Sequence, residues 1–317
     1  MKSKPNNQLT HSKTPKIILW AAIGLISLAA IVVLGISAYV GWNLTHPVRE
    51  EVTGSPADIG LAYENVSFKS REDGLNLSGW LIKSPGNEQT VIFAHGYRKN
   101  RMHNTVPLLP IADFLVDKGC NVLMFDFRNS GQSDGELTSV GQYEVRDLLG
   151  AIDFIKTRRD LNQQIILIGY SMGAATSILA GAREPAVAGV IADAPFADLR
   201  SYLMANLSVW SKLPAIPFNQ AFFIIVPPLT GLNVGAVSPV NEVKNFNGRP
   251  LLLIHGEGDT DIPIENSELL QKAYPRASFW RVPEAKHCKS YEVTGDLYLQ
   301  KISSFLDKVK ENSNEIR

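Results

Sequence analysis

From about residue 90 onward, short apolar runs alternate with longer segments of helical periodicity, and this alternation constrains the fold more than any other feature. It is typical of a parallel sheet that is covered by helices on both faces. Two earlier runs flank Arg71-Glu72-Asp73-Gly74, whose Asp-Gly pair predicts an antiparallel hairpin. The expected strands are residues 63–70, 75–83, 90–94, 121–125, 164–168, 187–192, 250–254 and 277–282.

Residues 61–317 are long enough for one large α/β domain, because such domains commonly exceed about 200 residues. An apolar fraction of 45% and a charged fraction of 20% exclude a disordered or fibrous chain. The alternation breaks at about residues 197–240, where aromatic, branched and proline residues gather. We expect a small cap inserted there, which either lines a substrate pocket as a lid or adds two helices to the core.

An uncharged apolar run covers residues 17–40 near the N-terminus. Its 24 residues, at ~1.5 Å each in a helix, are enough to cross a hydrocarbon core of ~30 Å. We therefore expect an N-terminal transmembrane helix. A cleaved signal peptide and a buried core helix are the alternatives, but a signal peptide has a shorter apolar region of roughly 7 to 15 residues.

The charges on the two sides of this run predict its orientation. Four lysines precede it, whereas acidic residues outnumber the basic one on the other side. Positive charge favours the cytoplasmic side, so residues 1–16 form a cytoplasmic tail and residues 41–60 an extracytoplasmic linker to the domain. The prediction is a single-pass protein of the cell membrane. The charged residues are Lys2, Lys4, Lys13 and Lys16 before the run, and Arg49, Glu50, Glu51 and Asp58 after it.

Charge and cysteine content narrow the possible partners. The chain has 31 basic and 31 acidic residues, and it has no basic stripe that would suit a nucleic acid. Its two cysteines, Cys120 and Cys288, are too few for a disulfide framework and lack the spacing of a zinc site. We expect two free thiols, no metal and no cofactor.

A candidate nucleophile lies in Gly169-Tyr170-Ser171-Met172-Gly173, between an apolar strand and a helix expected at residues 172–182. A serine attacks a carbonyl carbon only if it is exposed at a sharp turn and a base removes its proton. Glycines two residues before and after Ser171 allow such a turn, and the helix N-terminus favours developing negative charge. The motif in its strand–turn–helix setting predicts Ser171 as the nucleophile.

The base is expected late in the chain, since this kind of turn is followed by an acid and then a histidine. His287 follows the last expected strand, where a loop can carry an imidazole over the edge of the sheet. We predict Asp259, just after the preceding strand, as the acid that orients this imidazole. Asp261, as a turn carboxylate, and Asp193, after an earlier strand, are the alternatives.

Two backbone N–H groups must stabilise the oxyanion of an acyl-transfer reaction. One is expected from Met172, directly after the nucleophile. The other is expected from Tyr97, because the preceding His95-Gly96 ends a strand and lets the chain turn toward the substrate. The side chain of Arg98 has two interpretations, contact with substrate or solvation at the rim.

Taken together, these motifs resemble the α/β-hydrolase superfamily, and specifically its serine-aminopeptidase-like and monoacylglycerol-lipase-like members, some of which are bacterial and membrane-anchored. The resemblance spans about residues 66–306. It implies an eight-stranded, mostly parallel sheet with an antiparallel second strand, and it supports the triad of Ser171, Asp259 and His287. The motifs are His95-Gly96-Tyr97, Asp126-Phe127-Arg128-Asn129-Ser130-Gly131-Gln132-Ser133, the serine turn, Ser238-Pro239, Ile254-His255-Gly256 and Ala285-Lys286-His287.

One motif departs from the family pattern, because Asn129 and Ser130 stand where a glycine is usual. This departure falls in a structural loop, and we expect catalysis to be unaffected. The expected activity is hydrolysis of carboxyl esters, with lipid-like or medium-chain acyl esters as the expected substrates and the lipid bilayer as a further partner. An aminopeptidase and a catalytically silent binding protein are the alternatives, and the sequence leaves the oligomeric state open.

Overall fold

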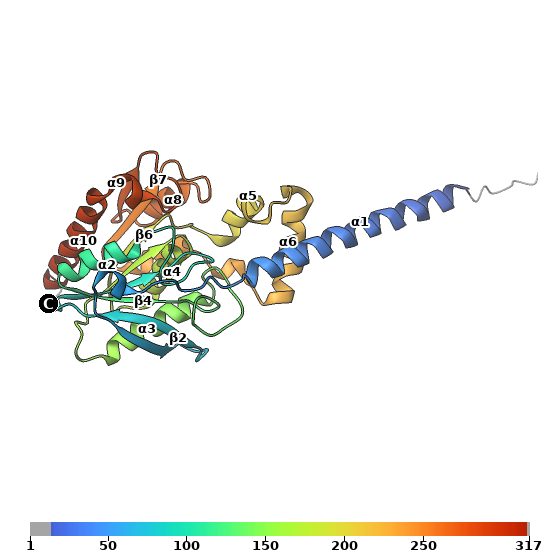
Figure 1. The fold of residues 1–317 in the computed structure, drawn as a ribbon. Helices are drawn as coiled ribbons and strands as arrows, with labels where there is room; N and C mark the ends of the chain where they lie inside the picture. Colours follow the sequence, from blue (N-terminus) through green and yellow to red (C-terminus); the bar gives the residue numbers. More distant parts are fainter. Residues whose placement is uncertain (1–13, 316–317) are drawn as a thin grey trace, which may run out of the picture.

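The computed structural model describes residues 14–315. Its centre is a sheet of eight strands in the order β1-β2-β4-β3-β5-β6-β7-β8 (Figure 1). Every strand lies within two residues of its predicted bounds. The strands are β1 Glu64–Lys69, β2 Asn76–Ile82, β3 Gln89–Ala94, β4 Cys120–Phe125, β5 Ile165–Tyr170, β6 Val187–Asp193, β7 Leu251–Gly256 and β8 Ser278–Val282.

The sheet is mixed, as expected. Strand β2 runs antiparallel to both of its neighbours, β1 and β4. All other neighbouring strands are parallel, so that the six strands β3 to β8 end at the same edge of the sheet. This edge therefore collects the loops that follow six strands, and ligands of open α/β sheets bind at such an edge.

Helices cover both faces of the sheet, which explains why its central strands are apolar throughout. In β5, Ile165 and Leu167 pack toward one face, and Ile166 and Ile168 pack toward the other. The first face is covered by α3 Glu144–Thr157, α4 Met172–Arg183 and α8 Glu265–Ala273, and the second by α2 Leu108–Asp117 and α10 Asp296–Glu315. Two short helices, α7 Pro239–Glu242 and α9 Ser290–Thr294, complete the body.

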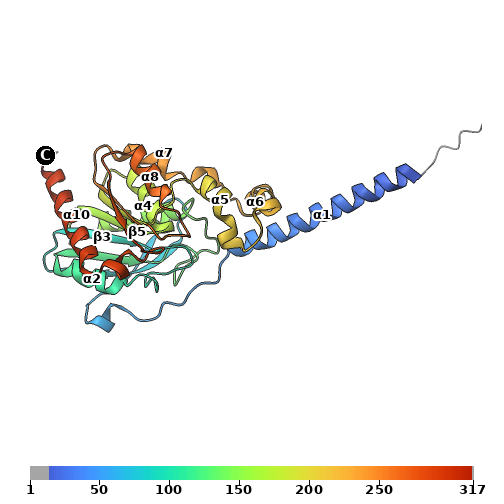
Figure 2. The same ribbon diagram turned by 90° about the horizontal axis from the view of Figure 1, so that it is seen from above.

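The region expected to form a cap contains two helices, α5 Leu199–Ser211 and α6 Ala215–Thr230, which meet at 113°. The Asp198 side chain accepts a 2.8 Å hydrogen bond from the Ser201 amide and so caps the start of α5. Both views of the ribbon show α5 and α6 at the end of the body where α1 joins it, with α6 beside the adjoining part of α1 (Figures 1 and 2).

The N-terminal helix α1 Thr14–Thr45 projects from the body and is long and apolar enough to cross a membrane. The helix is longer than the predicted membrane span of residues 17–40. The helix continues to Thr45, whose hydroxyl donates to the Gly41 carbonyl at 2.9 Å, and Pro47 then prevents its continuation.

The residues after α1 are also bound more firmly to the body than a flexible linker would be. The Thr138 amide donates to the Thr45 carbonyl at 2.7 Å. The guanidinium of Arg49 donates to the Ser133 carbonyl at 2.6 Å, and the Asn100 amide group donates to the Glu51 carbonyl at 2.9 Å. The last turn of α1 therefore has a defined position on the body.

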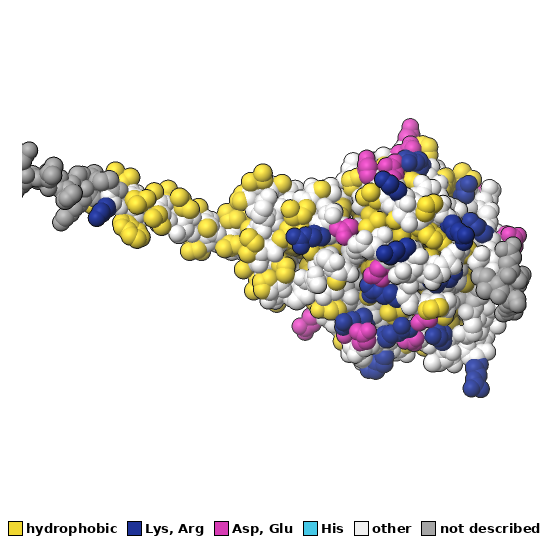
Figure 3. Space-filling view, turned by 180° about the vertical axis from the view of Figure 1, so that it is seen from behind, with side chains coloured by type: hydrophobic (Ala, Val, Ile, Leu, Met, Phe, Trp, Pro, Cys, Tyr) yellow, Lys and Arg dark blue, Asp and Glu magenta, His cyan; other side chains and the backbone are white. Residues whose placement is uncertain are grey.

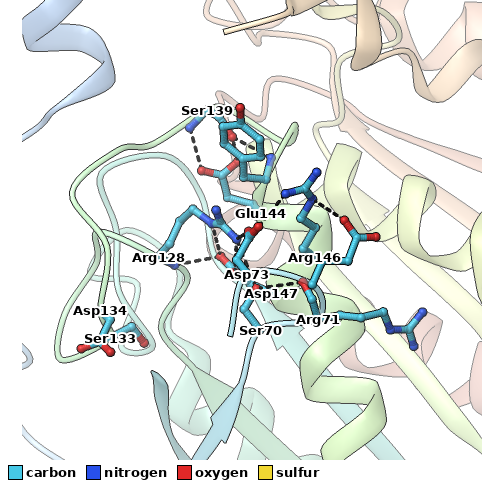
Figure 4. A network of polar contacts seen from close by, with 12 residues as sticks. Ser70, Arg71, Asp73, Arg128, Ser133, Asp134, Ser139, Glu144, Arg146 and Asp147 are labelled. Atoms are coloured by element: carbon cyan, nitrogen blue, oxygen red, sulfur yellow. Dashed lines mark hydrogen bonds and ion pairs between the residues drawn. The ribbon is translucent and has the colours of Figure 1, made fainter. Parts of the chain in front are cut away.

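The loop between β4 and α3 is held by buried charges (Figure 4). Arg128 forms two hydrogen bonds of 3.0 and 2.7 Å from its guanidinium to the buried Asp147 carboxylate, and it also pairs with Asp73. Asn129, which replaces the usual glycine, adopts a φ of 53°. Asparagine tolerates this left-handed conformation better than most residues, so the departure from the family pattern keeps the turn.

Candidate active site

Ser171 occupies the turn between β5 and α4. Its backbone has φ 55° and ψ −117°, which is sparsely populated by residues other than glycine. The Ser171 amide donates to the Asp193 carbonyl of the next strand at 2.8 Å and helps to hold this conformation. Such strain is characteristic of a turn that presents a side chain at the edge of the sheet.

The two glycines around Ser171 are required by close backbone contacts. A Cβ atom at Gly169 would lie 2.3 Å from the Gly173 carbonyl oxygen, and a Cβ atom at Gly173 would lie 2.0 Å from the Ala94 carbonyl oxygen. Both distances are far inside van der Waals contact. The chain can therefore make this turn beside β3 only with glycine at both positions.

The structure brings together the three side chains that the sequence predicted as a triad. The Nε2 atom of His287 lies 2.8 Å from the Ser171 hydroxyl oxygen. The Nδ1 atom of His287 lies 2.7 Å from a carboxylate oxygen of Asp259. The three residues follow β5, β7 and β8, so the shared edge of the sheet is what makes them neighbours. This geometry allows proton transfer from a serine to an imidazole.

Asp259 is buried, and its carboxylate is well supplied with donors. One oxygen accepts hydrogen bonds of 2.9 Å from the amides of Asp261 and Ile262. The other oxygen faces His287 and lies 3.4 Å from the Nε2 atom of His255. Burial alone would raise the pKa of Asp259, but hydrogen bonds from His255 and His287 lower it to about 2. Asp259 is therefore ionised at neutral pH.

The charge on Asp259 influences His287. Burial lowers the pKa of His287, whereas the neighbouring Cys288 and Asp259 raise it, and the net direction is upward. Burial also raises the pKa of the Cys288 thiol, so this thiol is uncharged at neutral pH. The Asp259 carboxylate is thus the charge that stabilises an imidazolium at His287.

The two alternative acids lie elsewhere. Asp261 contributes a backbone amide to Asp259, and its carbonyl accepts a 2.8 Å hydrogen bond from the Tyr202 hydroxyl. Asp193 is fully buried at the end of β6, where its carboxyl accepts a 3.0 Å hydrogen bond from the Tyr298 hydroxyl. Burial raises the pKa of Asp193 to about 6. Only Asp259 is hydrogen-bonded to His287 among these three carboxyls.

The segment expected to supply the second oxyanion donor lies beside Ser171. A Cβ atom at Gly96 would be 3.6 Å from the Ser171 Cβ atom, and Tyr97 and Met172 both line the cavity that contains Ser171. His103 is buried beside Gly96, where its Nε2 atom would lie 3.1 Å from a Cβ atom. Burial lowers the pKa of His103 to about 3, so it is neutral and leaves this region without an added charge.

A cavity of about 620 Å³, its mouth included, opens above Ser171. Its walls come from the body, from the cap helices and, unexpectedly, from the last turn of α1 through Leu44 and Thr45. The sequence offered no signal for this contribution, because residues 41–60 were expected to be a linker. The cap residues in the walls are Leu199, Tyr202, Leu203, Leu207, Trp210 and Phe222. Among the described residues, no group of three or more His, Cys, Asp or Glu is placed to hold a metal ion.

Comparison with known proteins places the chain in a family. The family described as "Serine aminopeptidase, S33" matches residues 85–224. The uncharacterized protein YfhR of Escherichia coli O157:H7 is 32% identical over 256 residues, which cover 77% of this chain and 80% of that protein. The chain is an α/β hydrolase. The resemblance seen in the sequence and the expected fold are both confirmed.

Two further proteins are similar to this hydrolase. The uncharacterized protein YqkD of Bacillus subtilis is 30% identical over 76% of this chain and 78% of its own length. A solved structure of the Pyrococcus furiosus esterase Pf2001 superimposes with a TM-score of 0.69 and 28% identity, covering 84% of this chain and 98% of that chain. The fold of this chain therefore covers almost the whole length of that esterase.

Proposed function

We propose that this hydrolase cleaves carboxyl esters through an acyl-enzyme, with Ser171 as nucleophile, His287 as base and Asp259 as the acid. The observation that carries the proposal is the hydrogen-bonded series from Asp259 through His287 to Ser171, with 2.7 and 2.8 Å between the bonded atoms. Catalytic triads with this geometry carry out acyl transfer in enzymes of unrelated folds.

In this mechanism, His287 takes the proton of the Ser171 hydroxyl as its oxygen attacks the ester carbonyl. The amides of Met172 and Tyr97 stabilise the oxyanion. The protonated His287 then gives its proton to the departing alcohol, which leaves an acyl group on Ser171. A water molecule, deprotonated by His287, attacks this acyl group, and release of the acid returns the proton to Ser171.

The lining of the cavity favours an ester with an apolar acyl group over a peptide. Apart from Ser171 and Thr45, the lining consists of apolar and aromatic side chains. An aminopeptidase needs an acidic group to bind the free amine of its substrate, and residues 199–240 contain no Asp or Glu. Similarity to the Pyrococcus furiosus esterase also favours an ester over a peptide as the substrate.

The decisive experiment compares hydrolysis of p-nitrophenyl esters by the full-length protein and by its Ser171→Ala variant. We expect the variant to lose at least about three orders of magnitude in kcat/KM and to lose labelling by a fluorophosphonate. Ser304→Ala, which removes an exposed hydroxyl on α10, is the control and keeps both. Equal ester turnover by wild type and Ser171→Ala would contradict the proposal.

We also propose that α1 anchors the hydrolase in the cell membrane, with the N-terminus in the cytoplasm and the body outside. Its apolar length and the lysines before it support this orientation. The native cysteines, Cys120 and Cys288, are buried, so an added thiol can report sidedness. A membrane-impermeant maleimide should label Ser304→Cys in intact cells and fail to label Ser3→Cys. The reverse pattern would refute the orientation.

A further inference from the structure

The last turn of α1 is part of the candidate active site. Leu44 and Thr45 line the same cavity as Ser171. The Tyr97 hydroxyl donates a 2.5 Å hydrogen bond to the Leu44 carbonyl, and the Tyr97 ring packs edge-on against Trp210 of the cap. The residue whose amide is proposed to bind the oxyanion thus also contacts the anchor and the cap.

A second cavity lies farther along α1. It comprises about 180 Å³, open space at its mouth included, and is bounded by Ser37 and Val40 of α1 on one side and by the cap on the other. Leu207 and Phe222 line both this cavity and the one above Ser171. The two cavities therefore adjoin, with these two side chains between them, and follow α1 from its last turn back toward its apolar middle.

The second cavity lies at the depth where a membrane ends. A hydrocarbon core of ~30 Å takes about 20 helical residues, which places its outer boundary near Ile36 when α1 enters the core after Lys16. Ser37 and Val40 then lie at this boundary. Trp42, which is 50% exposed, follows within the interfacial layer that aromatic side chains prefer.

Helix α6 lies beside this part of α1 and exposes an apolar face. A Cβ atom at Gly41 of α1 would be 2.0 Å from a methyl group of Val226, so the two helices are in direct contact. Ile216 and Ile224 of α6 are 77% and 67% exposed. In Figure 3, hydrophobic side chains continue from α1 onto the adjoining narrow part of the molecule, whereas most charged side chains lie on the wider part. A bilayer surrounding α1 would cover this face.

We propose that the hydrolase takes its substrate from the bilayer and that the acyl chain of a membrane lipid ester runs along α1. The ester carbonyl lies at Ser171, and the chain passes Leu207 and Phe222 into the space beside Ser37 and Val40. The anchor is then a wall of the acyl site. This inference rests on the proposed ester hydrolysis and adds the class of substrate and its route.

The test measures chain-length preference of the full-length protein in phospholipid vesicles. Substrates are p-nitrophenyl acetate, butyrate, laurate and palmitate, and the readout is the ratio of kcat/KM for the long esters to that for the short ones. Burial of each methylene group contributes roughly a fourfold preference, so wild type favours the long esters. Ser37→Trp fills the second cavity and should lower the ratio by about tenfold or more, which corresponds to two or more methylene groups.

Ile36→Trp is the matched control, because it places the same side chain on the neighbouring position, where Ile36 is exposed. It should keep the wild-type ratio. Leu207→Ala removes a side chain between the cavities and should raise the ratio. If the fluorophosphonate does not label Ser37→Trp, the site of that variant has not formed. The ratio measured for Leu207→Ala then tests the proposal on its own.

The inference is overturned if Ser37→Trp is labelled normally and keeps the wild-type ratio, or if Leu207→Ala leaves the ratio unchanged. A wild-type protein that hydrolyses only the short esters also overturns it while leaving the proposed function intact. Absence of both ester turnover and fluorophosphonate labelling in wild type would instead contradict the proposed function.

Discussion

At the scale of single residues, this hydrolase contains two buried carboxyls whose pKa values are shifted in opposite directions. Asp259 is surrounded by donors from two amides and two imidazoles, which keep it ionised. Asp193 is equally buried but has hydroxyl donors instead, from Tyr298 at 3.0 Å and Ser290 at 3.4 Å, and its pKa is raised. The number and charge of the donors therefore decide whether the pKa of a buried carboxyl is lowered or raised.

The first prediction concerns Asp259→Asn. Loss of the carboxylate should lower kcat by about four orders of magnitude, because the imidazole loses its orienting charge. His287 must be neutral to act as a base, so activity rises with pH through its pKa. Since Asp259 raises this pKa, the acidic limb of the pH–rate profile should move to lower pH in the variant. Asp261→Asn is the control, and a similar loss in that variant would count against Asp259 as the acid.

The second prediction concerns the pH dependence of stability. The folded protein holds the Asp193 proton more tightly than the unfolded chain does, since burial raises the pKa of Asp193 from its ordinary value to about 6. Stability from this group is therefore present at low pH and declines as the pH rises through about 4 to 6. Asp193→Asn removes this decline.

Thermal denaturation checks this second prediction. The Tm of Asp193→Asn minus that of wild type should increase between about pH 4 and pH 6. The exposed Asp113 on α2 serves for comparison, and Asp113→Asn should show a constant difference. A flat difference for Asp193→Asn would show that this carboxyl does not titrate in the folded protein.

At the scale of elements, two contacts decide how the parts around the site are held. Helix α6 packs on α1 where Gly41 allows Val226 to approach. The loop that carries Arg128 is fixed to α3 by the Asp147 carboxylate, which is fully buried. The first contact joins α1 to the cap. The second fixes the loop that continues to Val140, which lines the cavity.

The third prediction uses two of the three glycines of α1, Gly41 and Gly35. Gly41→Leu should force α6 away from α1, because even a Cβ atom at this position would lie 2.0 Å from Val226. Gly35→Leu is the matched control, since nothing lies within 4 Å of a Cβ atom there. Limited trypsin digestion in detergent should cleave Gly41→Leu faster after the exposed Lys212 between the cap helices. Equal cleavage in both variants would mean that the helices do not depend on this contact.

The fourth prediction compares a buried and an exposed ion pair. Asp147→Asn leaves the buried Arg128 guanidinium without its main partner and should lower the free energy of unfolding by about 3–5 kcal/mol. Asp153→Asn alters an ion pair with Arg71 whose side chains are 44% and 30% exposed, and should cost less than about 1 kcal/mol. Urea denaturation in detergent measures both, and comparable losses would contradict the argument from burial.

At the scale of the whole molecule, α1 consists of two segments with different surroundings. Its first half lies free of the body and is apolar enough to cross a membrane. From about residue 33, one side of the helix is covered, and Ser37, Gly41 and Thr45 are buried. The second half is therefore part of the folded domain. Removal of the whole helix for solubility would also remove a wall of the site.

The fifth prediction separates the contribution of the packed half of α1 from that of its exposed half. A chain that begins at residue 32 lacks most of the membrane segment but keeps the packed half of α1, whereas a chain that begins at residue 46 lacks both. The shorter chain should have a Tm lower by on the order of 5 °C, because it exposes several apolar side chains that are worth about 1.5–3 kcal/mol each. Calorimetry of the two chains in the same detergent tests this, and equal Tm values would show that α1 adds no stability to the body.

Much of the fold followed from local patterns. Each strand was predicted to within two residues, since strands that are buried on both faces are apolar throughout and are separated by turn residues. The turn at Ser171 was predictable because its backbone crowding requires glycines at fixed spacing. These features depend on residues that are near one another in the sequence.

Contacts between residues that are far apart in the chain were decided by the tertiary structure. Asp259 rather than Asp261 or Asp193 contacts His287 because of how three loops meet at the edge of the sheet. The end of α1 became a wall of the site because Leu44 meets Tyr97 and the cap. By itself, the sequence determined the sheet, the candidate triad and an apolar helix. Contacts between distant segments leave no local pattern, so only the folded chain determined that this helix also shapes the site.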